Sequence, residues 1–158
     1  VVSEPDYTPP SGSAVIALDV RIGDGSPLAS VRINGALSER FTLDTGGGGT
    51  LLIFDSFARK HPEALVDKRG GSGRDMIFNG IGGAIETRPY QLSSVQLGPI
   101  NFQDFVGYRV MNARSYDGDD DGVIGTDFLR LFTLGLDYAN SRVYLVPNRD
   151  GRLAMGIK

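Results

Sequence analysis

The stretch that decides the fold is FTLDTGGGGTLLIF, at residues 41–54. Two apolar runs that suit short β-strands flank a single acid, Asp44, which is followed by Thr45 and then by four glycines. Gly46 permits backbone conformations that other residues avoid, and it leaves space above the acid. The same three residues also form ordinary Asx turns at the ends of strands. The triplet therefore predicts either a turn or a site where another chain approaches a carboxylate closely.

Composition places the chain among globular proteins of a single domain. Its 158 residues include 16 Lys and Arg against 19 Asp and Glu, and the net charge of −3 predicts no nucleic-acid surface. No apolar run approaches the roughly 20 residues that span a bilayer. The absence of cysteine excludes disulfides, thiolate metal sites and a Cys nucleophile. With 22 glycines beside β-branched and aromatic runs, the sequence predicts an all-β fold with many tight turns.

The predicted elements are mainly strands joined by turns. We expect a strand at residues 14–22, hairpins turning at Asn34-Gly35 and at Asn140-Ser141, a further hairpin over residues 76–92, and two short strands around Gly98-Pro99. Asp55 and Thr126 are predicted to cap two short helices. We interpret residues 1–13 as an N-terminal arm or linker and residues 14–158 as one domain. Because the arm resembles the start of a processed chain, it favours an extracytoplasmic location such as the periplasm.

Two further segments have more than one interpretation. MIFNGIGGAI, at residues 76–85, predicts either an ordinary hairpin turn or a mobile β-flap whose backbone amides approach a ligand. The segment VIG, at residues 123–125, precedes a predicted helix and by itself indicates only a buried strand.

Taken together and in order, three segments resemble one lobe of a retropepsin, the retroviral type of aspartic protease. They are LDTG at residues 43–46, MIFNGIGGAI at residues 76–85 and DGVIGTDFLRLFTLGLDY at residues 121–138. The bacterial members of this family are the most similar in style, and the resemblance covers residues 28–146. It implies a closed β-barrel lobe with one or two short helices. It also implies an aspartic endopeptidase that acts on peptides or proteins without a cofactor or metal.

The resemblance implies a role for each matched position. Asp44 is the catalytic carboxylate, Thr45 locks two active-site loops together, and Gly46 is the position of close approach. The flap is formed by Gly80, Ile81, Gly82 and Gly83, and the active-site loop is supported from below by Val123, Ile124 and Gly125. In this chemistry two aspartates share one proton, because like charges about 3 Å apart cannot both ionise. The ionised carboxylate takes a proton from water, and the protonated one polarises the scissile carbonyl.

One chain supplies only one Asp-Thr-Gly triplet. The resemblance therefore implies a homodimer in which Asp44 of each chain meets at the two-fold axis. Two alternatives stay open: one lobe of a longer, two-lobed protease, and a non-catalytic domain for dimerisation or peptide binding. The second alternative arises because Gly47 and Gly48 stand where the family usually has Ala and then Ser, Thr or Asp. Without a hydroxyl or acid at Gly48, a hydrogen-bonding group near the catalytic carboxylate is lost.

The acidic segment DGDDDG, at residues 117–122, has the alternating acids of the first half of an EF-hand calcium loop. Phe128 occupies the position where that loop needs a bidentate Glu. We therefore interpret the segment as a solvated acidic loop with no metal. Other chemistries lack their motifs, since no G-x-S-x-G accompanies the single histidine and GGGGT has no P-loop lysine.

Overall fold

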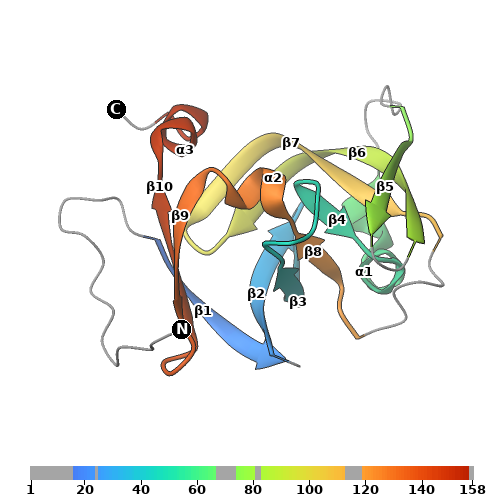
Figure 1. The fold of residues 1–158 in the computed structure, drawn as a ribbon. Helices are drawn as coiled ribbons and strands as arrows, with labels where there is room; N and C mark the ends of the chain where they lie inside the picture. The colour runs from blue at the N-terminus through green and yellow to red at the C-terminus, as the bar shows by residue number, and fades with distance from the viewer. Residues whose placement is uncertain (1–15, 24, 67–73, 81–82, 113–118, 157–158) are drawn as a thin grey trace.

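The computed structural model describes residues 16–23, 25–66, 74–80, 83–112 and 119–156, and the statements below refer to these residues. Ile81, Gly82, Asp117 and the expected boundary between residues 13 and 14 lie outside them. Strands dominate the described chain and the helices are short (Figure 1), which confirms the predicted all-β class. No helix there has the length and apolar character needed to cross a membrane.

The strands form one highly curved sheet. Their bounds are β1 Ile16–Gly23, β2 Ser26–Ile33, β3 Ala36–Leu43, β4 Leu51–Ile53, β5 Met76–Gly80, β6 Gly83–Leu97, β7 Ile100–Val110, β8 Gly122–Ile124, β9 Phe132–Asp137 and β10 Arg142–Pro147. Neighbouring strands follow the order β5-β6-β7-β4-β8-β3-β2-β1-β10-β9, and β6 pairs additionally with β2. That extra pairing joins β6, β7, β4, β8, β3 and β2 into a ring, so the predicted closed barrel is present.

The β2–β3 hairpin turns as the sequence predicts. Asn34 and Gly35 have φ angles of 48° and 95°, the positive values that a two-residue type I′ turn requires. The hairpin of β9 and β10 is also confirmed by their antiparallel pairing, and Ser141 in its turn has a φ of 53°. The third predicted hairpin is formed by β5 and β6, with Gly80 opposite Gly83.

Two apolar clusters fill the fold. The larger one lies inside the barrel, where Phe41 and Phe57 are fully buried and meet edge to face with their ring centroids 5.8 Å apart. The smaller one lies beneath the β5–β6 hairpin and contains buried Leu52, Phe54, Ile85 and Val110 with half-buried Phe78, Tyr108 and Val123. The second cluster lies next to the glycine loop, because a Cβ atom at Gly49 would lie 3.5 Å from the Phe78 ring.

Three predictions about individual elements are wrong. The strands on either side of Gly98-Pro99 are long, because β6 continues through Pro89 and stays paired with β7 from Thr87 to Leu97. Asp55 is the first residue of helix α1 (Asp55–Lys60) and caps nothing with its side chain. Instead its carboxylate accepts hydrogen bonds from Arg59 and Arg109, at 2.6 and 3.0 Å. The predicted cap at Thr126 is discussed with the site.

The helices exceed the one or two that were expected. A 3₁₀ helix, Pro62–Leu65, follows α1 directly, and helix α2 spans Thr126–Leu129. A third α-helix, α3 (Arg149–Ala154), was not predicted. It begins after Asn148, whose side-chain oxygen accepts hydrogen bonds from the backbone N–H groups of Asp150 and Gly151.

Candidate active site

The glycine loop, defined here as residues 44–50, connects β3 to β4 around the end of β8 (Figure 1). Strand β8 lies between them, parallel to β3 and antiparallel to β4. The chain thus leaves the sheet on one side of β8 and returns on the other. The backbone N–H of Asp44 donates to the carbonyl of Ile124 at 3.0 Å, so Asp44 lies beside the last residue of β8. Val123 and Ile124 accordingly lie in the strand between the two ends of the loop.

The start of α2 donates its backbone N–H groups to the carbonyls of the glycine loop. Thr126 N–H donates to Gly47 O at 2.8 Å, and Asp127 N–H donates to Gly49 O at 3.0 Å. Gly125 N–H donates to Thr50 O, also at 3.0 Å. The first N–H groups of a helix have no partner within the helix. Here the loop carbonyls accept hydrogen bonds from the N-cap residue and from the first two residues of α2. This exchange holds the loop against α2.

The hydroxyl of Thr126 strengthens the same contact. Its Oγ1 lies 2.7 Å from Gly47 O and 3.2 Å from Thr45 O. The prediction that Thr126 caps the helix is therefore wrong: Gly125 holds the N-cap position, and the Thr126 side chain turns to the loop. Two donors of one residue, the N–H and the hydroxyl, converge on the Gly47 carbonyl.

Gly125 is the point where α2 and the loop approach most closely. A Cβ atom there would lie 2.5 Å from Gly49 O, 2.8 Å from Gly48 O and 3.0 Å from Gly47 O. These are backbone atoms that cannot move aside without displacing the loop. Gly125 therefore leaves room for three carbonyl oxygens, which gives a physical reason for a glycine at this position.

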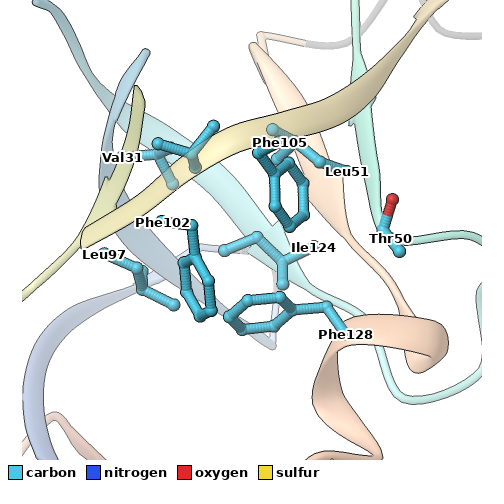
Figure 2. Close-up of a pocket in the computed structure, with 9 residues that line it drawn as sticks. Val31, Thr50, Leu51, Leu97, Phe102, Phe105, Ile124 and Phe128 are labelled. Atoms are coloured by element: carbon cyan, nitrogen blue, oxygen red, sulfur yellow. The ribbon is translucent and has the colours of Figure 1, made fainter. Parts of the chain in front are cut away.

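Helix α2 is itself anchored in the barrel. Phe128 is buried, and its ring lies among Phe102 and Phe105 of β7, with centroid distances of 5.3 and 6.4 Å. Figure 2 shows these three rings beside Ile124, around a small apolar pocket between β7 and α2. The pocket is lined almost entirely by carbon atoms of the barrel core. The glycine loop is thus fastened to a helix that is packed against aromatic side chains.

The carboxylate of Asp44 is half-buried and held by one backbone donor. Gly46 N–H donates to its Oδ1 at 2.8 Å. A Cβ atom at Gly47 would lie 2.6 Å from Oδ2, so the carboxylate occupies space that any other residue at Gly47 would fill. Thr45 and Gly46 are exposed. The resemblance does not explain a glycine at position 47, and the close contact with Asp44 supplies a reason.

Gly48 and Gly49 face the β5–β6 hairpin. Cβ atoms at these positions would lie 3.8 and 3.5 Å from the ring of Phe78, and Gly49 has a φ of 86°. The Phe78 ring meets Tyr108 edge to face, with centroids 5.7 Å apart. Of the expected flap residues, Gly80 and Gly83 pair across the hairpin. Ile81 and Gly82 lie outside the described residues.

The acidic segment contains a residue whose structural role was missed. Asp121 is only 3% exposed, and its carboxylate accepts hydrogen bonds of 2.8 Å from Ser38 Oγ and from Lys60 Nζ. Burial opposes its ionisation, but hydrogen bonds from Lys60, Ser38 and Ser56 outweigh that effect and lower the pKa of this carboxyl. The expectation of a solvated acidic loop is therefore wrong for Asp121, though Asp119 is exposed beside Arg40. The sequence signal for this buried role was the position of Asp121 directly before the short apolar strand Gly122–Ile124.

Comparison with known proteins agrees with this architecture. Residues 29–128 match the family described as aspartyl protease, and the chain belongs to that family. Among solved structures, a retropepsin-like aspartic protease from Rickettsia conorii is similar, with a TM-score of 0.56 and 19% sequence identity over 84% of this chain and 98% of that chain. The retropepsin-like fold expected from the sequence is thereby confirmed. No curated protein matches the chain.

Proposed function

We propose that this protein is an aspartic endopeptidase whose active site forms when two copies of the chain bring their Asp44 carboxylates together. The observation that carries the proposal is the state of Asp44. Its carboxylate is half-buried, accepts one hydrogen bond from Gly46 N–H, and is flanked by exposed Thr45. The loop behind it is fixed by α2 and β8, so the acid is held in place while its outer side stays accessible to another molecule.

A single copy does not complete the chemistry. The water must lose a proton to one carboxylate while a second, protonated carboxyl polarises the scissile carbonyl. Asp121, at the other end of β8, is buried against Ser38 and Lys60 and is not available for this role. A second copy related by a two-fold axis supplies an identical carboxylate.

Strand β9 favours association of two copies. Among the described residues it is the last strand in the sheet order and pairs with β10 alone, so its outer edge can accept another strand. At the C-terminal end of β9, the side chains of Leu136 and Tyr138 are 49% and 46% exposed. The strand follows α2 after only two residues, which places this edge close to the helix that braces the glycine loop.

In the proposed mechanism the two Asp44 carboxylates share one proton and hold a water between them. The ionised carboxylate removes a proton from the water as the oxygen attacks the scissile carbonyl, and the other carboxyl donates its proton to the carbonyl oxygen. Collapse of the tetrahedral intermediate transfers a proton to the leaving amine. The hairpin of Gly80, Ile81, Gly82 and Gly83 covers the substrate from the far side, and Thr45 holds the two glycine loops together.

The test compares three chains in a peptidase assay. Asp44→Asn is expected to lower kcat at least about 10⁴-fold, because the general base is lost. Asp127→Asn, which changes an exposed acid beside the same loop, is the matched control and is expected to keep full activity. Cleavage retained by Asp44→Asn sinks the mechanism.

A mixing experiment tests the shared site. Wild-type chain at fixed concentration is titrated with Asp44→Asn chain, and equal amounts are expected to reduce activity to about half, because mixed dimers have only one base. No cleavage by the wild type, together with a monomeric mass in analytical ultracentrifugation, would instead indicate one lobe of a two-lobed enzyme, and unchanged activity in the mixture would contradict the shared site. Peptide binding without cleavage by the wild type would indicate the non-catalytic alternative.

A further inference from the structure

The starting observation is the convergence of Thr126 on one peptide group. Its backbone N–H lies 2.8 Å from Gly47 O and its hydroxyl oxygen 2.7 Å from the same atom. A carbonyl oxygen has two lone pairs, and both are used here. The orientation of the Gly47 carbonyl is therefore fixed by a residue 79 positions further along the chain.

The second observation lies on the opposite side of Gly47. The Cβ position at Gly47 is 2.6 Å from Oδ2 of Asp44 and 3.1 Å from its Cγ. The α-carbon of Gly47 thus faces the carboxylate, while its carbonyl faces Thr126. A rotation of this residue would move its α-carbon relative to the acid and disturb the adjacent Gly46 N–H, which donates to Oδ1 at 2.8 Å.

The same hydroxyl also lies 3.2 Å from Thr45 O, the carbonyl directly after the acid. The Thr126 hydroxyl therefore contacts the loop on either side of Gly46. Helix α2 provides a firm base for these contacts, because Phe128 is buried among the aromatic rings of β7.

We propose that Thr126 is a positioning residue of the active site, whose hydroxyl sets the orientation of the Gly47 peptide and through it the position of the Asp44 carboxylate. The inference rests on the proposed function. In this role Thr126 itself contacts neither the substrate nor the water molecule that attacks it. Because it aligns the reacting group and contributes nothing to substrate binding, its loss affects kcat and leaves KM unchanged.

The first experiment replaces the hydroxyl with a methyl group of the same shape. Thr126→Val is expected to reduce kcat between about tenfold and a hundredfold at constant KM, because small displacements of a catalytic group cost rate on this scale. Thr126→Ser retains the hydroxyl and is expected to restore kcat. The matched control is Thr42→Val, at a position two residues before Asp44. It removes the 2.8 Å hydrogen bond from the Thr42 hydroxyl to the Asp120 carboxylate and is expected to leave kcat unchanged.

The second experiment is a double-mutant cycle with Gly47→Ala. A methyl group at Gly47 displaces the Asp44 carboxylate directly, so this variant alone is expected to lower kcat. If Thr126 acts through the Gly47 peptide, the two changes are not additive, and the double variant loses much less than the product of the single losses. Normal kcat in Thr126→Val, failure of Thr126→Ser to restore it, or additive effects would each overturn the proposal.

A third measurement needs no catalysis. Amide hydrogen exchange of Gly46, whose N–H donates to Asp44, is expected to quicken about tenfold in Thr126→Val and to remain unchanged in Thr42→Val. Equal exchange in the two variants contradicts the positioning role. An inactive wild type with the expected exchange pattern would refute the proposed function alone, and an active wild type with no Thr126 effect would refute only this inference.

Discussion

Strand β8 begins beside one aspartate and ends beside another, and the two acids have opposite surroundings. Asp121 precedes the strand, is 3% exposed, and accepts hydrogen bonds from Ser38 and Lys60. Asp44 lies at the far end, next to Ile124, half-buried and bonded through its carboxylate to Gly46 N–H. A buried charge needs partners to be tolerated, whereas a reactive carboxylate needs unsatisfied lone pairs to bind water. The two acids therefore differ in the number of hydrogen-bond donors around them, and this difference matches the structural role of Asp121 and the proposed catalytic role of Asp44.

The largest expected effect on stability comes from adding a side chain where β8 meets the glycine loop, near Asp44. Gly125→Ala places a methyl group 2.5 Å from Gly49 O, within the backbone of the glycine loop, and is expected to cost about 3 kcal/mol of unfolding free energy. Gly48→Ala is the control, because its methyl group meets only the Phe78 ring at 3.8 Å. Chemical denaturation of both variants measures the difference, and equal stabilities would show that the loop yields easily.

Removing the charge at the other end of β8 is expected to have the next largest effect. Asp121→Asn leaves Lys60 without its buried partner and weakens the bond from Ser38, at a cost of about 2 kcal/mol. Asp119→Asn, in the same segment but with a side chain 95% exposed, is expected to change stability by less than about 0.5 kcal/mol. Thermal melts of the two variants distinguish the loss of the buried contacts of Asp121 from a general effect of removing a negative charge.

The contribution of Asp121 to the unfolding free energy should depend on pH in the acidic range. Because the folded state lowers the pKa of Asp121, its contribution to stability is complete above the unfolded value of about 3.9 and is lost as the pH falls through the lower folded value. We expect the gap in unfolding free energy between wild type and Asp121→Asn to narrow progressively below about pH 4. Denaturation curves collected from pH 6 to pH 2 measure this gap. A constant gap would contradict the assignment.

The smallest effect on stability is expected at the residue with the largest effect on activity. Asp44→Asn changes a half-exposed carboxylate whose Gly46 hydrogen bond an amide oxygen can also accept, so the unfolding free energy should change by less than about 0.5 kcal/mol. A large loss of stability would mean that Asp44 is part of the fold's framework, as Asp121 is, and would remove the contrast between them.

Much of the fold could be predicted because its signals are local. Asn34-Gly35 specifies a tight turn through its own backbone preferences, and alternating apolar residues specify strands wherever they pair. The segment containing Asp44 could be singled out because a lone acid among glycines is unusual between two apolar runs. Helix α3 also has a local signal, since Asn148 is a favourable N-cap residue, although the helix was not predicted.

The remaining features depend on contacts that no local pattern encodes. The sequence shows that Gly47 lacks a side chain, but only the folded chain shows that Asp44 occupies the vacated space. Threonine is a favourable N-cap residue, but Gly125 holds that position and the Thr126 hydroxyl donates to a loop carbonyl 79 positions away. Asp121 looked solvated in an acidic run, since its partners Ser38 and Lys60 are 83 and 61 positions away.

That distance along the chain has a consequence for the timing of biosynthesis. The Asp-Thr-Gly triplet leaves the ribosome before the groups that brace it, from Ile124 to Asp127, which are synthesised about 80 residues later. Until they arrive, β3 and β4 lack the strand that lies between them. A nascent chain therefore carries a protease motif that is not yet assembled, and we expect chains stopped at residue 121 to hydrolyse no peptide in the assay used for the full sequence. Because the brace follows the triplet by about 80 residues, the proposed active site cannot assemble until most of the domain has been made.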